Sequence, residues 1–86
     1  MAENVVMPKL GLTKTRGIVS KWFKREGDEV KKGEIICQVE TDKIVSDVEA
    51  PSDGFILKII VEEGEEEKVL MPICIIGGKE ELEKYK

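Results

Sequence analysis

The two halves of this 86-residue chain repeat each other at a fixed spacing of 37 positions. Seven pairs of identical residues, which include glycines, lysines, glutamates, isoleucines and cysteines, are separated by this spacing, with no insertion or deletion between them. The matched pairs are Gly17 and Gly54, Lys21 and Lys58, Glu26 and Glu63, Gly27 and Gly64, Lys31 and Lys68, Ile36 and Ile73, and Cys37 and Cys74. A looser echo pairs residues 5–8 with residues 48–51. Internal self-similarity of this kind predicts one domain assembled from two similar halves.

Each half reads as strand, proline turn, strand, glycine loop, strand. Apolar residues alternate with polar ones or form short runs, and proline or glycine bounds them, as is typical of β-strands. Gly27 and Gly33 are expected at tight turns that need a positive φ. The strands are expected at residues 4–7, 17–24, 35–40, 45–50, 55–61 and 69–76. The pattern therefore predicts an all-β fold.

The size of the chain limits what it does alone. A single domain of this length buries roughly 60% of its unfolded surface, which leaves little room for an enclosed active site. Aromatic residues make up 5% of the chain, so the core is expected to consist of valine, isoleucine, leucine and the two cysteines. Catalysis by this chain in isolation is not expected.

The charge of the chain narrows the range of partners. The formal net charge is −4, and no polybasic run or aromatic platform accompanies it, which argues against nucleic acid and anionic membranes as partners. No apolar stretch approaches the length of a membrane span, and residues 1–4 lack the parts of a signal peptide. We therefore expect a cytoplasmic location and a monomeric isolated domain.

The two cysteines, Cys37 and Cys74, occupy equivalent places in the two halves, each within an apolar strand. Small buried core residues are the favoured interpretation, with a disulfide or redox pair as the minor one. The chain has no histidine and no Cys-x-x-Cys spacing, so no metal site is expected.

Two charged segments are open to more than one interpretation. Residues 62–67 are acidic, and we interpret them as a solvated loop, with a docking patch for a basic partner as the alternative. Residues 78–86 are highly charged beyond the expected domain of residues 1–77. They are expected to begin an interdomain linker, disordered unless Leu82 or Tyr85 docks on the domain.

Lys43 lies in the middle of the turn Glu40-Thr41-Asp42-Lys43-Ile44-Val45, between two expected strands. A lysine at a hairpin tip is displayed rather than buried. Its close charged neighbours are carboxylates, whereas Schiff-base lysines are usually desolvated or set beside another cation. The position suits an attachment point that a separate enzyme modifies with an activated acyl donor.

These motifs resemble the lipoyl domain of the dihydrolipoamide acyltransferase component of 2-oxoacid dehydrogenase complexes. The resemblance runs from about residue 5 to residue 76. It rests on Met7-Pro8-Lys9-Leu10-Gly11, on Gly27-Asp28-Glu29-Val30-Lys31-Lys32-Gly33, on Glu40-Thr41-Asp42-Lys43 and on Ala50-Pro51-Ser52-Asp53-Gly54. It implies a flattened β-barrel, a barrel-sandwich hybrid of two four-stranded antiparallel sheets with quasi-twofold symmetry.

The resemblance also implies a function. Lys43 would carry lipoate in amide linkage, and the domain would be a swinging arm that shuttles acyl groups and reducing equivalents, without catalysing a step. The implied partners are a thiamine diphosphate-dependent 2-oxoacid decarboxylase, an acyltransferase core, dihydrolipoyl dehydrogenase and a lipoate ligase. Which 2-oxoacid is processed does not follow from this chain.

Further roles come from matching positions in the family. Glu40 and Gly54 match positions that ligases recognise, although Glu40 is equally explained as a solvated charge and Gly54 as a turn glycine. Asp42 and Ile44 would shape the turn, and Ile44 departs from the alanine that the family often has there. The loop that decarboxylases read would be Leu12, Thr13, Lys14, Thr15 and Arg16, which is cationic at two positions.

Other protein classes compete with this interpretation. Biotin carrier domains are similar but usually flank their lysine with methionines, and neither neighbour of Lys43 is methionine. A purely structural hybrid barrel would carry no cofactor. The glycine-cleavage carrier protein is also similar around the lysine, but it is longer and has helical additions. A stand-alone enzyme is disfavoured because no acid, base and nucleophile converge.

Overall fold

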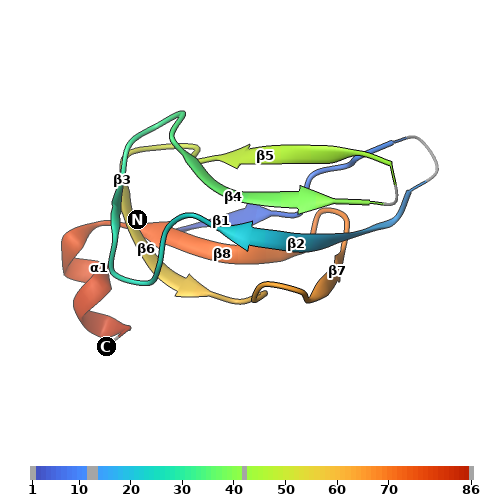
Figure 1. Cartoon of the computed structure of the whole chain (residues 1–86). Coiled ribbons are helices and arrows are strands. Elements are labelled where there is room, and N and C mark those ends of the chain that lie inside the picture. The colour runs from blue at the N-terminus through green and yellow to red at the C-terminus, as the bar shows by residue number, and fades with distance from the viewer. Residues whose placement is uncertain (1, 12–13, 42, 86) are drawn as a thin grey trace.

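The computed structural model describes residues 2–11, 14–41 and 43–85, and it is dominated by β-strands (Figure 1). Within these ranges the strands are β1 (Glu3–Val6), β2 (Arg16–Trp22), β3 (Glu29–Val30), β4 (Ile35–Glu40), β5 (Val45–Glu49), β6 (Gly54–Ile59), β7 (Glu66–Lys68) and β8 (Pro72–Gly77), followed by the helix α1 (Lys79–Lys84). The expectation of an all-β fold is confirmed.

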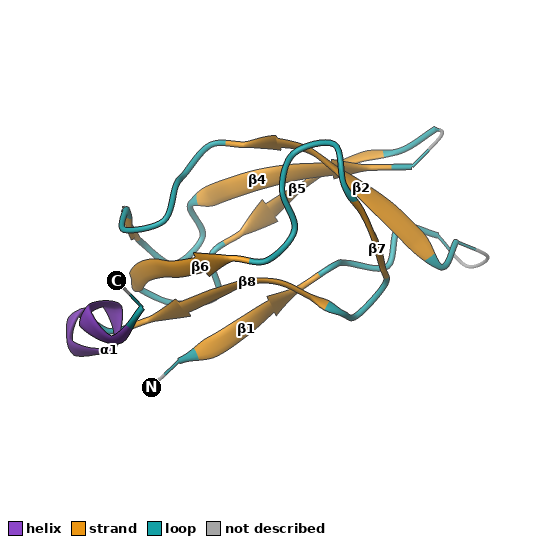
Figure 2. Cartoon of the chain, turned by 90° about the horizontal axis from the view of Figure 1, so that it is seen from below, coloured by secondary structure: helices purple, strands orange, loops and turns teal. Residues whose placement is uncertain are grey.

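The strands form two four-stranded antiparallel sheets with matching strand order. One sheet has the order β1-β8-β6-β3 and the other the order β5-β4-β2-β7. The 37-residue spacing maps β2 onto β6, β3 onto β7 and β4 onto β8, and each pair occupies the same position in its sheet. Residues 46–49 of β5 match β1. The sheets face each other as a flattened barrel-sandwich, seen edge-on in Figure 2, so the predicted architecture with its quasi-twofold symmetry is confirmed.

Backbone hydrogen bonds repeat with the same spacing as the sequence. The N–H of Gly27 donates to the carbonyl of Ile56, and the N–H of Gly64 donates to the carbonyl of Val19, both at 2.7 Å. Donors and acceptors in the two bonds are each 37 positions apart, with the halves exchanged. Gly27 has φ 93° and Gly64 φ 85°, as expected for glycines at tight turns.

Two glutamates show that the repeat extends to side chains. The carboxylate of Glu63 accepts a hydrogen bond from the backbone N–H of Trp22 at 2.9 Å, and the carboxylate of Glu26 accepts one from the N–H of Ile59 at 2.8 Å. Each loop therefore ties down the strand end of the other half. The glutamates retained by the repeat are structural ligands for backbone donors.

The core lies between the sheets and is built as the composition predicts. Val19, Ile36, Val39, Ile56 and Ile73 are completely buried, and both cysteines are buried and unpaired. Met7, also completely buried, adds to the valine, isoleucine and cysteine side chains that were expected. The interpretation of the cysteines as core residues is confirmed.

Two of the expected element assignments in the C-terminal half are wrong. Glu66–Lys68 was expected within or beside an acidic loop, but it forms β7, which pairs antiparallel with β2. The strand expected at residues 69–76 begins only at Pro72, because residues 69–71 form a turn. Strand periodicity does not detect a short edge strand made of charged residues.

The C-terminal segment packs onto the domain instead of leaving it. The helix α1 lies against β6, and Leu82 and Tyr85 line a cavity of about 240 Å³ together with Leu57. Leu57 is 3% exposed but lies outside the core between the sheets, because Ile56 beside it points inward and alternate residues of a strand face opposite sides. The exception to disorder that the sequence left open, docking of Leu82 or Tyr85, is therefore the case observed, and α1 lies against β6. That these residues begin an interdomain linker stays a prediction.

The chain ends and the turn between β4 and β5 lie at opposite poles of the domain (Figure 1). The domain is elongated, with principal extents of 39 × 20 × 19 Å. Within the described ranges no helix is long and apolar enough to span a membrane.

Candidate functional site

The turn between β4 and β5 holds Lys43 at one pole of the barrel. Glu40 and Val45 are Cα partners at the ends of the two strands, and the N–H of Thr41 donates to the carbonyl of Ile44 at 2.9 Å. Paired strands and this hydrogen bond fix the turn from both sides. Lys43 is exposed in it, as the sequence predicted, while Asp42 lies outside the described residues.

The two residues that follow the lysine, Ile44 and Val45, are apolar and exposed. Ile44 is 42% exposed and Val45 is 58% exposed. Leu70 is the non-glycine residue with a positive φ in the described ranges, so the β-branched Ile44 sits in the turn without that kind of strain. The larger residue at the position where the family often has alanine is therefore accommodated.

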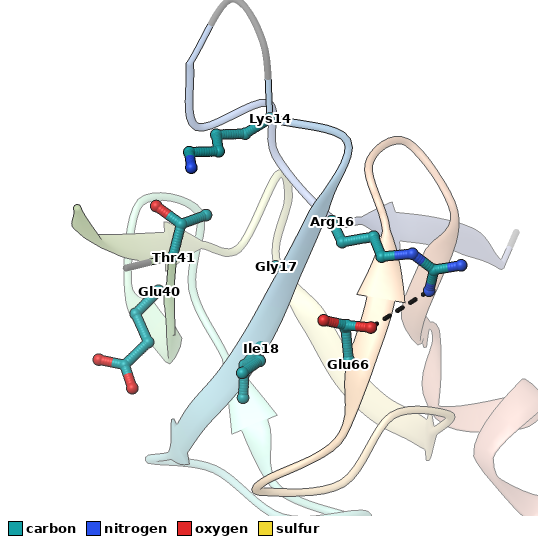
Figure 3. Close-up of a pocket in the computed structure, with 7 residues that line it drawn as sticks. All are labelled: Lys14, Arg16, Gly17, Ile18, Glu40, Thr41 and Glu66. Atoms are coloured by element: carbon teal, nitrogen blue, oxygen red, sulfur yellow. Dashed lines mark hydrogen bonds and ion pairs between the residues drawn. The ribbon is translucent and has the colours of Figure 1, made fainter. Parts of the chain in front are cut away.

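An open cleft of about 410 Å³ lies beside this hairpin (Figure 3). It is lined by Lys14, Arg16, Gly17, Ile18, Glu40, Thr41 and Glu66. On one wall the guanidinium of Arg16 pairs with the carboxylate of Glu66 at 3.3 Å. Most of the lining side chains are polar or charged, so the cleft suits a polar protein surface better than an apolar small molecule.

The cleft brings the expected partner loop and the lysine hairpin together. Lys14 and Arg16 come from the loop side, and Glu40 and Thr41 from the hairpin side. Thr15 is exposed and its carbonyl accepts a hydrogen bond from Val69, whereas Leu12 and Thr13 lie outside the described residues. The neighbourhood of loop and hairpin is observed for the described residues, and their role in recognising a partner stays a prediction.

Gly54 lies away from the lysine turn and is not a turn glycine of the kind we expected. It begins β6, whose first residues lie near the chain ends (Figure 1). A Cβ atom at this position would come within 2.8 Å of the carbonyl oxygen of Gly77. No positive φ requires glycine here, so the local need for it is close packing between β6 and β8.

Neither cysteine contributes chemistry at the lysine pole. Burial raises the pKa of the Cys37 thiol to about 12, with a further contribution from nearby Cys74, and burial alone raises that of Cys74 to about 12. Thiols of this kind are poor nucleophiles and metal ligands near neutral pH. Throughout the described ranges no cluster of three potential metal-ligating side chains occurs.

Sequence reasoning missed two residues near the lysine pole. Ile18 lines the cleft because it alternates with the buried Val19, and that alternation was visible in the sequence. Leu70 has φ 71°, and the 37-residue spacing pairs it with Gly33, where a positive φ was expected. A leucine at the counterpart of a turn glycine was the available signal.

Comparison with known proteins agrees with this geometry. Residues 3–76 match the Biotin_lipoyl family, described as biotin-requiring enzyme. The solved lipoyl domain of the 2-oxoglutarate dehydrogenase complex from Azotobacter vinelandii superposes with a TM-score of 0.70 at 32% identity, covering 87% of this chain and 96% of that domain.

Two longer relatives are also similar. The dihydrolipoyllysine-residue acetyltransferase component of the acetoin cleaving system of Bacillus subtilis is 47% identical over 81 residues, which is 94% of this chain and 20% of that protein. A mitochondrial dihydrolipoyllysine-residue acetyltransferase component of the pyruvate dehydrogenase complex of Arabidopsis thaliana is 38% identical over 86 residues, 98% of this chain and 16% of that protein. The chain thus spans a fifth or less of these relatives.

Proposed function

This chain belongs to the biotin and lipoyl attachment family, as a lipoyl domain, and from that membership we propose that Lys43 is the residue that carries lipoate, in amide linkage to its Nζ. The domain is a carrier of the group and not itself a catalyst. Family membership does not by itself identify the attachment residue, the partners or the parent protein, and we propose all three.

The observation that carries the proposal is the presentation of Lys43. Its side chain is exposed at the pole of the barrel, in a turn fixed by the pairing of Glu40 with Val45 and by the hydrogen bond from Thr41 to Ile44. Across residues 2–11, 14–41 and 43–85 no ion pair holds the Lys43 amine. An enzyme that forms the amide can therefore approach the amine without unfolding the domain.

The residues around Lys43 would hold an attached lipoyl group and leave it accessible. When bound, lipoate supplies a disulfide that accepts two electrons and an acyl group. The Lys43 turn holds the point of attachment, and the two paired strands behind it limit its motion. The open cleft beside the turn leaves room for the surface of another protein to approach the lysine, with Lys14 and Arg16 among the residues that line it.

We further propose that the chain is the lipoyl part of a dihydrolipoamide acyltransferase. The named relatives of which it spans a fifth or less support this. A thiamine diphosphate-dependent 2-oxoacid decarboxylase would then acylate the arm, the acyltransferase core would receive the acyl group, and dihydrolipoyl dehydrogenase would reoxidise it. A lipoate ligase would load Lys43.

Biotin is the second candidate group because the family includes biotin-requiring enzymes. The residue after Lys43 is Ile44 and the residue before it is Asp42, whereas biotin carriers usually have methionines at both places. The lipoyl domain at 32% identity also favours lipoate.

The test is a mass measurement after loading. The domain is incubated with lipoate, ATP and a lipoate ligase, and intact mass is followed by peptide mapping. We expect a gain of one lipoyl group on Lys43, lost in Lys43→Ala. Lys58→Ala is the matched control, since Lys58 is also an exposed lysine but lies in β6 instead of the hairpin turn, and this variant should load like the unaltered domain.

Each result is decisive. Modification at any lysine other than Lys43 would refute the assignment of the residue. An unchanged mass with a ligase that loads a known lipoyl domain in the same tube would refute lipoylation of Lys43 and leave biotin, tested with a biotin ligase, and a purely structural barrel.

A further inference from the structure

Three residues on neighbouring strands line up directly behind the lysine turn. Ile18 of β2 is the Cα partner of Glu40 in β4, and Glu40 is the Cα partner of Val45 in β5. Residues directly opposite each other in an antiparallel sheet place their side chains on the same face. We call Val45, Glu40 and Ile18 the pole strip. It crosses three strands, so its two ends are roughly 10 Å apart.

The pole strip lies on the outer face of its sheet. Val19 and Val39, which adjoin Ile18 and Glu40 in the sequence, are completely buried in the core, and successive residues of a strand face opposite sides. Ile18 therefore points outward and is 37% exposed, while Val45 is 58% exposed. Glu40, between them, is half-buried. The strip thus has an exposed aliphatic side chain on each side of one carboxylate.

The other half of the domain covers the equivalent surface with its own chain. The repeat pairs Ile18 with Phe55 in β6, and Phe55 is half-buried. The helix α1, which follows β8, packs against β6, and Leu82 of α1 lines a cavity together with the buried Leu57. In the lysine half, β4 is followed by the Lys43 turn and β5, and Ile18 stays exposed. An outer face that is covered in one half is open in the other.

Lys43 is close to the pole strip along the chain. It is two residues from Val45 and three from Glu40, and Ile18 and Glu40 both line the open cleft beside its turn (Figure 3). The cleft as a whole is polar, which disfavours a free apolar ligand. A group joined covalently to Lys43 needs far less affinity, because a short flexible tether gives an effective concentration on the order of millimolar.

The small size of the pole strip limits what can occupy it. A specific interface between proteins buries about 1,000 Å² or more, which two aliphatic side chains on either side of a carboxylate do not supply. A single aliphatic chain that starts at the neighbouring lysine can touch both of them. The strip therefore fits a tethered chain better than a protein surface.

We propose that Ile18 and Val45 form a resting site for the aliphatic part of a lipoyl group on Lys43. The proposal rests on the proposed function of Lys43. Contact with the two side chains is weak, with a dissociation constant in the millimolar range. At an effective concentration on the order of millimolar such contact leaves the arm docked for about half of the time, so a partner protein displaces it easily.

The first measurement is NMR spectroscopy of the wild-type domain in two forms, one with a lipoyl group and one with an acetyl group on Lys43. Both modifications remove the lysine charge, but only the lipoyl group adds a long aliphatic chain. We expect NOEs between that chain and the methyl groups of Ile18 and Val45, and Ile18 methyl signals that differ between the two forms. The methyl signals of Ile35 should be the same in both.

The second measurement is the rate at which dithiothreitol reduces the lipoyl disulfide to the dithiol, while dithiothreitol is itself oxidised to its cyclic disulfide. Ile18→Ala should raise this rate about twofold, as expected when an arm that is docked for about half of the time is released. Ile35→Ala is the matched control and should leave the rate unchanged. Ile35 is 38% exposed and lies at the other end of β4 from Glu40, about 17 Å along the strand.

Either measurement can overturn the proposal. Identical Ile18 methyl signals in the lipoyl and acetyl forms, without NOEs to the lipoyl chain, would do so, and this result does not depend on the folding of any variant. Equal reduction rates in the wild type and Ile18→Ala would also overturn it. Failure of the proposed function would appear earlier and separately, as an unchanged mass after incubation with lipoate ligase.

Discussion

Gly54→Ala separates two explanations of the glycine that follows the lysine turn by eleven residues. One explanation, taken from resemblance to the family, is that a ligase recognises it. The structure offers another, because a Cβ atom there would stand 2.8 Å from the carbonyl oxygen of Gly77 and 3.1 Å from Cγ2 of Ile76. The first predicts a defect in loading, and the second predicts a defect in stability.

The size of the stability effect follows from the nature of the obstructing atom. A carbonyl oxygen of the neighbouring strand cannot rotate away as the end of a flexible side chain can, so β6 and β8 must separate slightly. Overpacking of this kind costs typically about 1–3 kcal/mol. For a domain of this size 2 kcal/mol corresponds to a Tm lower by roughly 8–16 °C.

Two assays measure the two effects. Thermal unfolding gives the Tm, and the initial rate of lipoylation is measured well below the Tm of the variant, where it is folded. Gly11→Ala is the matched control, since the nearest atom to its added Cβ is the flexible Lys14 side chain at 3.5 Å. We expect a large loss of Tm in Gly54→Ala alone, and loading rates close to wild type in both variants.

The reasoning fails if Gly54→Ala unfolds within about 2 °C of the Gly11→Ala control. It also fails if the folded Gly54→Ala domain loads more than about tenfold slower than wild type. The second result would mean that a ligase reads the surface at the start of β6, far from the lysine pole.

Three further predictions concern stability. Glu63→Ala removes the acceptor of the Trp22 N–H and should lower the free energy of unfolding by about 1 kcal/mol, measured by urea unfolding. Truncation after Gly78 removes α1, exposes Leu57 and should lower it by about 1–2 kcal/mol, less than full burial of a leucine because ordering of the helix is no longer required. Burial raises the pKa of both cysteine thiols from 9.0 to about 12, so the unfolded chain releases these protons first. Stability from this source is complete below pH 9 and is lost as the pH rises from about 9 to 12.

Each of these predictions has a control in the same part of the chain. Glu62→Ala is the control for Glu63→Ala because Glu62 lies in the same acidic loop and its side chain makes no hydrogen bond among the residues that the structure describes. It should leave the free energy of unfolding within about 0.5 kcal/mol of the wild-type value. Leu82→Ala should reproduce part of the truncation effect, while Glu80→Ala should not. Cys37→Ala combined with Cys74→Ala should flatten the loss of stability at high pH, and an undiminished loss in that variant would assign it to other groups.

The repeat made most of the fold predictable because it is expressed in backbone hydrogen bonds. Gly27 and Gly64 bind the opposite halves at identical distances, and the turn glycines were identifiable from the sequence alone. The lysine hairpin was likewise predictable, since β4 begins and ends as expected and β5 begins as expected. These elements combine an apolar pattern with turn residues, so local signals and the fold agree.

Elements that lack an apolar pattern were not predictable. β7 contains only glutamate and lysine, and its existence depends on pairing with β2. The docking of α1 depends on Leu57 on the outer face of β6, and within the apolar run of residues 55–57 no alternation with polar residues distinguishes it from the core residues. Gly54 appeared to be a turn glycine because proximity to Gly77, 23 positions later, is a tertiary property.

The symmetry of the fold also explains why attachment point and chain ends lie at opposite poles. The repeat equates β4 with β8 and β5 with β1, so the counterpart of the turn that joins β4 to β5 is the gap between the end of β8 and the start of β1 (Figure 1). Four residues, including Lys43, join β4 to β5. No chain segment joins the end of β8 to the start of β1, so the N-terminus and the C-terminal helix lie there. A chain of two such intertwined halves has one place for a displayed lysine, and any segment joined to either terminus begins at the opposite end of a 39 Å domain. A segment joined to either terminus and a lipoyl group on Lys43, as we propose, would therefore be kept apart by the topology itself, which would leave the lysine pole accessible to the proposed partners.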